Sequence, residues 1–358
     1  MPNLSWNLQP ASDKITMRYP EFLKENGKIG FIAPSFGIAI EPYITRFAAA
    51  KEKFEKMGYC PVTGPNVYKS DGTGKSSSAE NCAAEINDFF INDRSDVIFS
   101  CGGGETMCED LAGVDFEAIS GAEPKWFMGF SDNTNLTFTL PVLADTAAIY
   151  GSCAAAFGRK WYRDAEDCLD LVCGKKLSFK NYDRWESGSP EDAGPLDPYN
   201  LTMENSTYVV LPDGKTEAGF SGRMLGGCLD CLQVLCGTKY DKVKEFNRRY
   251  ASDGVIWFLE ACDLNPMEVW RALWQLDSAG WFETAKGFIT GRPRLYDFEE
   301  CCGMTKENAV TDVLGRHGVP IVMDADLGHL PPAMPFISGA LADVKAGYRK
   351  LEISYRLK

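Results

Sequence analysis

Short apolar segments alternate with amphipathic segments between residues 28 and 150, and this alternation constrains the fold more than any other feature. The apolar segments predict buried strands at Lys28–Ala33, Asp96–Ser100, Lys125–Phe130 and Ala147–Tyr150. The periodicity between them predicts helices at Tyr43–Met57 and Ser78–Asn92. Strands that are apolar throughout and alternate with helices form parallel sheets with both faces covered. The pattern therefore predicts an α/β domain.

The alternation stops between residues 174 and 215, where proline, glycine and acidic residues gather in runs such as ESGSPEDAGPLDPYN. This composition predicts a linker or a long functional loop. A second α/β unit follows, with strands expected at Gly254–Leu259, Gly287–Thr290 and Pro320–Met323 and helices near Leu225–Leu235, Pro266–Ala279 and Lys306–Arg316. We therefore expect an N-terminal domain at 1–173, a linker at 174–215 and a C-terminal domain at 216–358.

The charge balance excludes several classes of partner. The chain carries 37 Lys and Arg against 50 Asp and Glu, a formal net charge of -13. An acidic chain is a poor partner for nucleic acid or an anionic membrane, since both need a basic surface. The N-terminus has no basic, apolar and small-residue sequence typical of a signal peptide. The stretch Asn133–Gly158 is interrupted by Pro141 and Asp145 and predicts no membrane span. We expect a cytoplasmic protein.

The 13 cysteines are expected to be reduced thiols, because disulfides are rare in the cytoplasm. Cys228 and Cys231 form a C-x-x-C pair, whereas Cys301 and Cys302 are adjacent without a spacer. A structural zinc site needs two spaced pairs. We therefore expect small buried side chains, and neither a metal nor a cofactor.

Ser131 lies where a predicted strand turns directly into a helical segment, in GFSDN. This geometry exposes a side-chain oxygen at the carboxyl end of a parallel sheet, as in the nucleophile elbow of hydrolases. The segment departs from G-x-S-x-G because Asn133 stands at the second glycine position. The alternative is an ordinary helix N-cap made by Ser131 or Asp132. Ser35 and Ser152 are weaker candidates for a nucleophile.

Histidine is scarce, with two in the whole chain. His329 lies in a loop between glycine and prolines, where packing gives little reason for an imidazole. His317 lies at a helix C-terminus, where an imidazolium complements the helix dipole. His329 is therefore the better candidate for a general base, although a loop histidine can also be inert.

Glu260 ends the apolar strand VIWFLE, at the sheet edge where α/β folds place active-site groups. It could orient an imidazole, or it could form a surface salt bridge. Ser131, Glu260 and His329 follow the chain order of the α/β-hydrolases, which by itself is weak evidence.

The turn Cys101–Gly104 follows a predicted strand, and its glycines allow the backbone to approach a ligand closely. It matches neither the P-loop nor the dinucleotide-binding motif, so we expect no nucleotide cofactor. Cys101 is a further candidate nucleophile, which would indicate a cysteine amidotransferase.

Six separated segments resemble the LD-carboxypeptidases, serine peptidases that include the microcin C self-immunity proteins. The resemblance spans the chain from about Lys28 to its end. The segments are IGFIAPSFG, FSCGGGE, KWFMGFSDNTNLTF, SGRMLGGCLDCLQVLCGT, WFLEACDLNPMEVWRALWQLDSAGWF and LGHLPPAMPFISGALADV. The long insert before Tyr208 is more similar to the microcin-immunity branch than to the shorter murein enzymes.

The resemblance implies a catalytic triad of Ser131, Glu260 and His329, with an oxyanion hole from the backbone N–H groups of Asp132 and Gly103. It implies a flavodoxin-like N-terminal domain, of the class I glutamine amidotransferase type, and a smaller swivelling β/β/α-type C-terminal domain. It also implies a homodimer without a cofactor or metal.

The resemblance leaves the substrate open. A microcin C-like peptidyl or aminoacyl nucleotide is expected first, and a murein tetrapeptide of cell-wall recycling is the alternative. A non-catalytic ligand-binding relative is also conceivable. Members often carry asparagine where Cys228 stands, an acid where Ala261 stands and, among murein enzymes, arginine where Cys101 stands. An anionic substrate would need basic contacts, for which the candidates are Arg159, Arg223 and Arg292.

Overall fold

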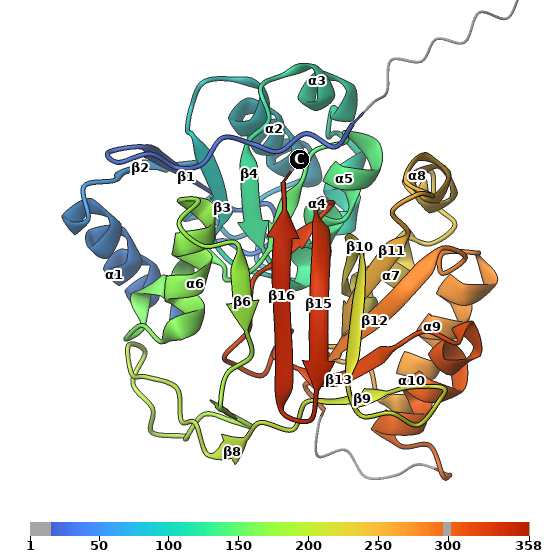
Figure 1. Cartoon of the computed structure of the whole chain (residues 1–358). Coiled ribbons are helices and arrows are strands. Elements are labelled where there is room, and N and C mark those ends of the chain that lie inside the picture. Colours follow the sequence, from blue (N-terminus) through green and yellow to red (C-terminus); the bar gives the residue numbers. More distant parts are fainter. Residues whose placement is uncertain (1–15, 296–301, 358) are drawn as a thin grey trace, which may run out of the picture.

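The computed structural model describes residues 16–295 and 302–357, and within them two large sheets dominate the architecture (Figure 1). One sheet has six strands and the other has eight, and a two-stranded ribbon lies apart from both. The mixed α/β architecture with parallel sheet cores that the sequence predicts is confirmed. The flavodoxin-like and swivelling assignments and the domain boundaries stay predictions.

The first sheet has the strand order β14-β5-β4-β3-β1-β2, in which β1 to β5 are parallel. This is a doubly wound order, with the helices on two sides. Figure 1 shows α1 and α6 on one side of the sheet and α2, α3 and α5 on the other. The elements are β1 Lys28–Ile32, α1 Tyr43–Lys56, β2 Cys60–Thr63, α2 Ala79–Ile91, β3 Val97–Ser100, α3 Phe116–Gly121, β4 Trp126–Gly129, α4 Thr134–Thr137, α5 Thr139–Leu143, β5 Ala148–Tyr150, α6 Arg163–Val172 and β14 Phe336–Ser338.

The predicted elements of this unit form for the expected physical reasons. Every residue of β3 and β4 is buried, as a central strand covered on both faces requires. The side chain of Ser78 accepts a hydrogen bond from the N–H of Asn81 and thereby caps α2. Gly58, at a φ of 90°, takes the left-handed conformation just after α1.

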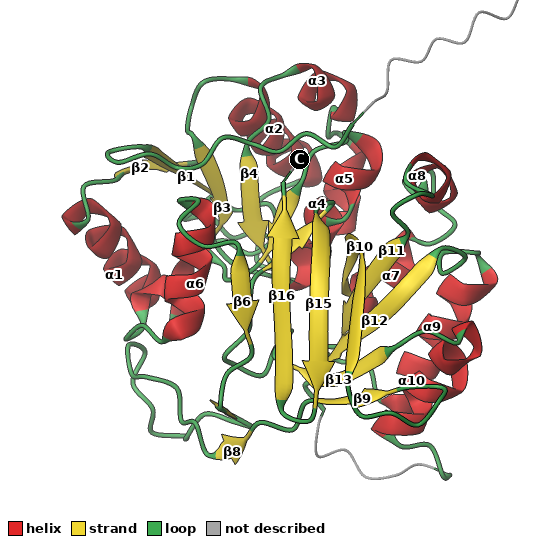
Figure 2. Cartoon of the chain, viewed as in Figure 1, coloured by secondary structure: helices red, strands yellow, loops and turns green. Residues whose placement is uncertain are grey.

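The second sheet has the order β6-β16-β15-β10-β11-β12-β13-β9 (Figure 2). Its centre, β10 to β13, is parallel, and antiparallel strands extend it at both edges. Pro266 opens α9 behind a capping box of Asn265 and Glu268. The elements are β6 Ser178–Lys180, β9 Tyr208–Val210, β10 Ala218–Cys228, α7 Leu229–Leu235, α8 Val243–Arg249, β11 Val255–Glu260, α9 Pro266–Ser278, β12 Ala285–Gly291, α10 Lys306–Leu314, β13 Ile321–Ala325, β15 Leu341–Gly347 and β16 Lys350–Arg356.

Two sequence expectations differ from the structure. The segment from Leu225, expected to be helical, continues as strand β10 to Cys228, and the helix begins only at Leu229. Gly226 explains the difference, because a Cβ there would meet the Phe258 carbonyl oxygen at 1.8 Å. The segment 174–215, expected to be a linker, supplies β6 and β9 to the second sheet and forms the ribbon of β7 (Arg184–Trp185) and β8 (Met203–Glu204). These strands are too short to give a periodic signal.

The two sheets are joined by a strand and by aromatic contacts. Strand β14 follows the loop after β13 but pairs antiparallel with β5 of the first sheet. Phe138 stacks on Trp281 at 5.0 Å between ring centroids, and Tyr150 lies 5.7 Å from Phe258. The chain therefore crosses back to the first sheet directly after the loop that carries His329.

Candidate active site

Ser131 occupies a strained turn at the carboxyl end of β4. Its φ of 62° lies in the left-handed region, which is unfavourable for a residue with a side chain. A short 3-10 helix, Ser131–Asn133, begins there and continues into α4. The Tyr150 hydroxyl accepts a hydrogen bond from the Ser131 N–H at 3.0 Å. The turn that the sequence suggested is therefore present, and a tyrosine from the neighbouring strand supports it.

A hydrogen-bonded chain joins Ser131 to two residues of the second sheet. His329 Nε2 lies 2.9 Å from Ser131 Oγ, and His329 Nδ1 lies 2.9 Å from Glu260 Oε2. Glu260 is the last residue of β11, whereas His329 lies in the loop after β13. Parallel strands end at the same sheet edge, which brings their following residues together. The structure thus brings together the three residues singled out in the sequence.

The environment of Glu260 favours its ionised form. Its side chain is buried, and burial alone would raise the pKa of the carboxyl group. The charge of His329 and hydrogen bonds outweigh burial and hold the pKa of Glu260 below its usual value. The second oxygen, Oε1, accepts a hydrogen bond from the Tyr150 hydroxyl at 2.5 Å. Both carboxylate oxygens are therefore occupied, one by the imidazole and one by the tyrosine.

The pKa of His329 is shifted in the opposite direction. Burial alone would lower the pKa of the imidazole, but the charge of Glu260 and the hydrogen bond to it raise this pKa well above its usual value. The burial also raises the pKa of Tyr150, with the Glu260 charge adding to it, so its phenol keeps its proton. The imidazole is thus held in place by Glu260 and stabilised in its charged form.

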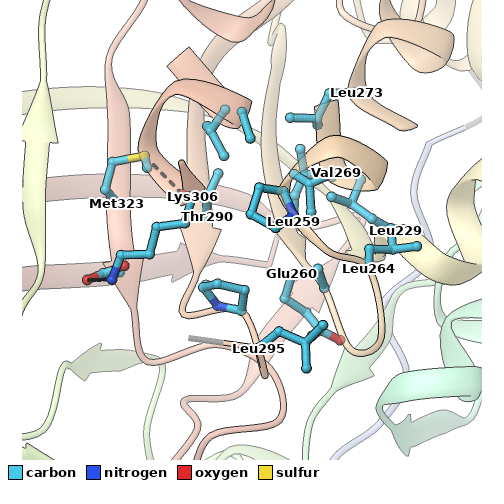
Figure 3. Close-up of a pocket in the computed structure, with 17 residues that line it drawn as sticks. Leu229, Leu259, Glu260, Leu264, Val269, Leu273, Thr290, Leu295, Lys306 and Met323 are labelled. Atoms are coloured by element: carbon cyan, nitrogen blue, oxygen red, sulfur yellow. Dashed lines mark hydrogen bonds and ion pairs between the residues drawn. The ribbon is translucent and has the colours of Figure 1, made fainter. Parts of the chain in front are cut away.

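A small apolar cavity of about 40 Å³ adjoins Glu260 on the side of α9 (Figure 3). Its walls are mostly aliphatic side chains from β11, α7, α9 and the loop before α9, among them Leu229, Leu259, Leu264, Val269 and Leu273. Apolar walls lower the local dielectric, which strengthens the attraction between Glu260 and the imidazole.

The glycine turn lies directly against Ser131. A Cβ added at Gly103 would be 3.1 Å from Ser131 Cβ and 3.2 Å from its Oγ. Asn133 fixes this approach by donating hydrogen bonds from Nδ2 to the carbonyl oxygens of Gly102 at 2.9 Å and Phe130 at 3.0 Å. The backbone of Gly103 is therefore close enough to the serine to face the same reacting group.

Asp132 contributes its backbone and its side chain in different ways. Asp132 lies in the first turn of the helix, where backbone N–H groups have no partner within the helix. Its buried carboxylate accepts hydrogen bonds from Ser35 Oγ at 2.5 Å, the Met107 N–H at 3.0 Å and Asn135 Nδ2 at 3.0 Å. The side chain thus fixes the turn that follows Ser131.

A cavity of about 460 Å³ opens beside Ser131 and His329. The glycine turn, Tyr150 and three arginines, Arg46, Arg159 and Arg294, also line it. Of the arginines expected to bind an anion, only Arg159 lines this cavity. Arg223 is ion-paired with Asp253 at 2.6 Å, and Arg292 is buried against Asp326. Their positive charges are therefore used within the protein.

The other candidate residues have roles elsewhere. The Ser35 hydroxyl donates a hydrogen bond to Asp132, and Ser152 lines the cavity. His317 contacts Asp277 at 2.9 Å, at the end of α10 and its following turn. Cys101 is fully buried, and burial raises the pKa of its thiol well above the usual value, which disfavours the nucleophilic thiolate.

The cysteines that suggested a metal site do not form one in the described part of the chain. No group of three or more His, Cys, Asp or Glu side chains between residues 16 and 295 or 302 and 357 is arranged to hold a metal ion. Cys228 and Cys231 flank the start of α7, while Cys301 lies outside the described residues. All cysteines that the structure describes are free thiols.

Sequence reasoning missed Tyr150 and Asp230. Tyr150 ends β5, next to the strand that carries the serine, so its position at the sheet edge was a usable signal. Asp230 accepts hydrogen bonds from the N–H groups of Cys262 and Asp263, both at 3.0 Å, and so holds the loop after Glu260. Nothing in the local pattern around Asp230 indicates this contact between distant segments.

Comparison with known proteins identifies the family. The sequence profile of the LD-carboxypeptidase N-terminal domain matches residues 29–151, and that of the LD-carboxypeptidase C-terminal domain matches residues 221–344. The chain belongs to the LD-carboxypeptidase family. Two curated relatives are "Putative carboxypeptidase SCO6489" of Streptomyces coelicolor, 24% identical over 91% of this chain and 93% of its own length, and "Putative carboxypeptidase YocD" of Bacillus subtilis, 23% identical over 92% and 96%.

Solved structures share the fold of this LD-carboxypeptidase family member. An MccF-like protein from Bacillus anthracis superimposes with a TM-score of 0.78 at 19% identity, covering 95% of this chain and all 100% of that one. The microcin immunity protein MccF, in complex with glutamyl sulfamoyl guanosine, gives 0.76 at 20% identity, covering 94% and 98%. Among the described residues, no helix combines the length and apolar character needed to cross a bilayer.

Proposed function

We propose that the protein is a serine peptidase or amidase in which Ser131, His329 and Glu260 form the catalytic triad. The observation that carries this proposal is the continuous hydrogen-bonded chain from Ser131 Oγ through the imidazole to Glu260. A serine bonded to an imidazole that is oriented by a buried carboxylate is the arrangement that activates a hydroxyl for acyl transfer.

The proposed mechanism gives each group one role. Ser131 Oγ attacks the carbonyl carbon of an amide while its proton passes to His329 Nε2. Glu260 holds the proton on Nδ1 and stabilises the imidazolium that forms. The N–H groups of Asp132 and Gly103 donate hydrogen bonds to the oxyanion. His329 then protonates the leaving amine. In the second half, His329 takes a proton from the water that attacks the acyl-enzyme and returns it to Ser131 Oγ.

The substrate that we propose is a peptide or aminoacyl amide, first of all one joined to a nucleotide-like group. Support comes from solved structures of MccF that hold glutamyl sulfamoyl guanosine and aspartyl sulfamoyl adenosine. The alternative is the amide before the terminal D-alanine of a murein tetrapeptide, which the family's name supports. A cavity of about 460 Å³ has room for a ligand of this size.

The test is hydrolysis of both substrates by the wild-type protein and by Ser131→Ala, followed by mass spectrometry. We expect turnover of at least one substrate and a loss of about 10⁴-fold or more in kcat/KM for the variant, because the nucleophile is gone. Circular dichroism of the variant should match the wild type. Undiminished hydrolysis by Ser131→Ala would refute the assignment of the nucleophile.

A further inference from the structure

We propose that Arg46 and Arg159 form an anion-binding subsite at one end of the active-site cavity. They would hold a phosphate or carboxylate group of the substrate. The inference rests on the proposed function, since it describes what the cavity beside Ser131 recognises. Both arginines line that cavity together with Ser131, Gly103 and His329.

The two arginines are brought together by a close backbone approach. Arg46 belongs to α1, and Arg159 follows the 3-10 helix Ala154–Gly158. The two helices pack so tightly that a Cβ at Gly158 would lie 1.9 Å from the Arg46 carbonyl oxygen. Only glycine fits there, and the residue after it is Arg159. The fold therefore fixes these two positive charges as neighbours.

Among residues 16–295 and 302–357, neither guanidinium lies within ion-pair distance of a carboxylate, although the more distant charge of Glu186 raises the pKa of Arg46. Arg46 Nε donates to the carbonyl oxygen of Pro195 at 2.8 Å, and Arg159 Nη1 donates to that of Asp197 at 3.3 Å. The guanidinium of Arg159 also lies 5.6 Å from the ring centre of Tyr199. These contacts orient the side chains without neutralising them.

The proximity of the two charges is unfavourable in the free protein. Burial lowers the pKa of Arg46, and the charge of Arg159 lowers it further. Asp164 also lines the cavity, where it accepts hydrogen bonds from the Tyr199 hydroxyl at 3.0 Å and the Ala165 N–H at 2.9 Å. Its carboxylate is therefore engaged by these two donors and forms no ion pair with either arginine. A bound anion would relieve this repulsion.

Arg294 provides an internal contrast. It lines the same cavity, but Asp263 pairs with it at 2.6 Å and balances its charge. Guanidinium groups bind phosphate and carboxylate through paired hydrogen bonds, and two together match a group with several acceptor oxygens. Arg46 and Arg159 therefore form the better anion site. They give an acidic chain of net charge -13 a local positive charge with which to hold an anionic substrate.

The test measures binding, which is independent of turnover, by calorimetry on the full-length protein carrying Ser131→Ala. The ligands are AMP with adenosine as its uncharged counterpart, and Nα,Nε-diacetyl-L-lysyl-D-alanine with its uncharged C-terminal amide. We expect Arg46→Gln and Arg159→Gln each to weaken binding of an anionic ligand about tenfold, since each removes a charged hydrogen bond. Binding of the uncharged counterparts should change less than about twofold. The matched control is Arg248→Gln, which removes an arginine that pairs with Glu245 outside the cavity and should leave all binding unchanged.

The outcomes separate the anion's source and the two proposals. A loss confined to AMP identifies a phosphate site, and a loss confined to the dipeptide identifies a carboxylate site. If a Gln variant unfolds, Arg46→Lys and Arg159→Lys replace it, because they keep the charge and should retain part of the affinity. Unchanged anion binding in the double Gln variant, or no preference of the parent for either anion, would overturn the subsite. Hydrolysis by the Ser131→Ala parent would instead overturn the proposed triad.

Discussion

The two sheets contribute different parts of the candidate active site, and they do so by different physical means. The first sheet presents Ser131 by backbone strain, at a φ of 62° above a glycine turn. The second sheet presents Glu260 and His329 by burial and charge, with pKa values displaced in opposite directions. The candidate nucleophile is thus held by the conformation of the chain, whereas the candidate base is held by its charged, buried partner.

The division also depends on how the sheets are joined. Strand β14 returns to the first sheet within a few residues of His329, and the Tyr150 hydroxyl bonds to both Ser131 and Glu260. Two connections therefore hold the imidazole near the serine. One is the short chain segment from His329 to β14, and the other is the pair of hydrogen bonds made by the Tyr150 hydroxyl.

The largest effect is expected for the base of the second sheet. His329→Asn should lower kcat/KM by about 10⁴-fold or more, because the change removes the proposed base for the serine proton. His317→Asn is the matched control, since His317 also contacts a carboxylate, that of Asp277, but lies away from Ser131. Its activity should stay within about twofold of the wild type. Equal losses in the two variants would show that the effect comes from folding.

Glu260→Gln should lower kcat by about 10³-fold in steady-state assays. The amide nitrogen can donate to His329 Nδ1, which selects the tautomer with its proton on Nε2, and that nitrogen then cannot accept the serine proton. A thermal melt compares stability in parallel. A loss below about tenfold would mean that the carboxylate is not needed to orient the imidazole.

Tyr150→Phe should lower kcat by about tenfold, since supporting hydrogen bonds of this kind are worth about 10–100-fold in activity. The change removes the donor to Glu260 Oε1 and the acceptor for the Ser131 N–H. Tyr355→Phe removes another fully buried hydroxyl, one bonded to the N–H of Ile337, and should leave kcat unchanged. Identical rates in both variants would argue against a role for Tyr150 in joining the sheets.

The pH dependence should show the raised pKa of His329. Below that pKa the imidazole is protonated and cannot act as a base, so kcat/KM should rise with pH through and above neutrality, less than tenfold per pH unit. Glu260→Gln removes the charge that raises the pKa, so the rising limb should move to lower pH. Stopped-flow or steady-state rates between pH 5 and 9, roughly spanning the titration of histidine, measure it. An unmoved limb would contradict the coupling.

Much of this architecture could be predicted from the sequence, and the exceptions have physical causes. Strands such as Val97–Ser100 are apolar throughout, so alternation with helices suffices to find them. The end of strand β10 is predicted as helix because Leu225–Cys228 run into an apolar helical segment. The close contacts that Gly226 and Gly227 make with β11 and α4 involve distant parts of the chain. The ribbon and edge strands in 174–215 depend on partners far along the chain, which local patterns do not encode.

The residues of the candidate site also differ in how far the sequence predicts them. Ser131, Glu260 and His329 each stand next to a strand end, which is a local signal, and the family resemblance links them. Tyr150, Asp230 and Arg46 act through contacts with distant segments, so their roles become visible only when the sheets are assembled.

The central claim is that residues from two sheets act as one catalytic unit, and a double-mutant cycle tests it most directly. The measurement is kcat/KM for Ser131→Ala, His329→Asn and the double variant on one hydrolysed substrate. If the residues act as a unit, the double variant is about as slow as either single variant, because the first loss already abolishes the activated hydroxyl. Losses that multiply in the double variant would show independent contributions and contradict the claim.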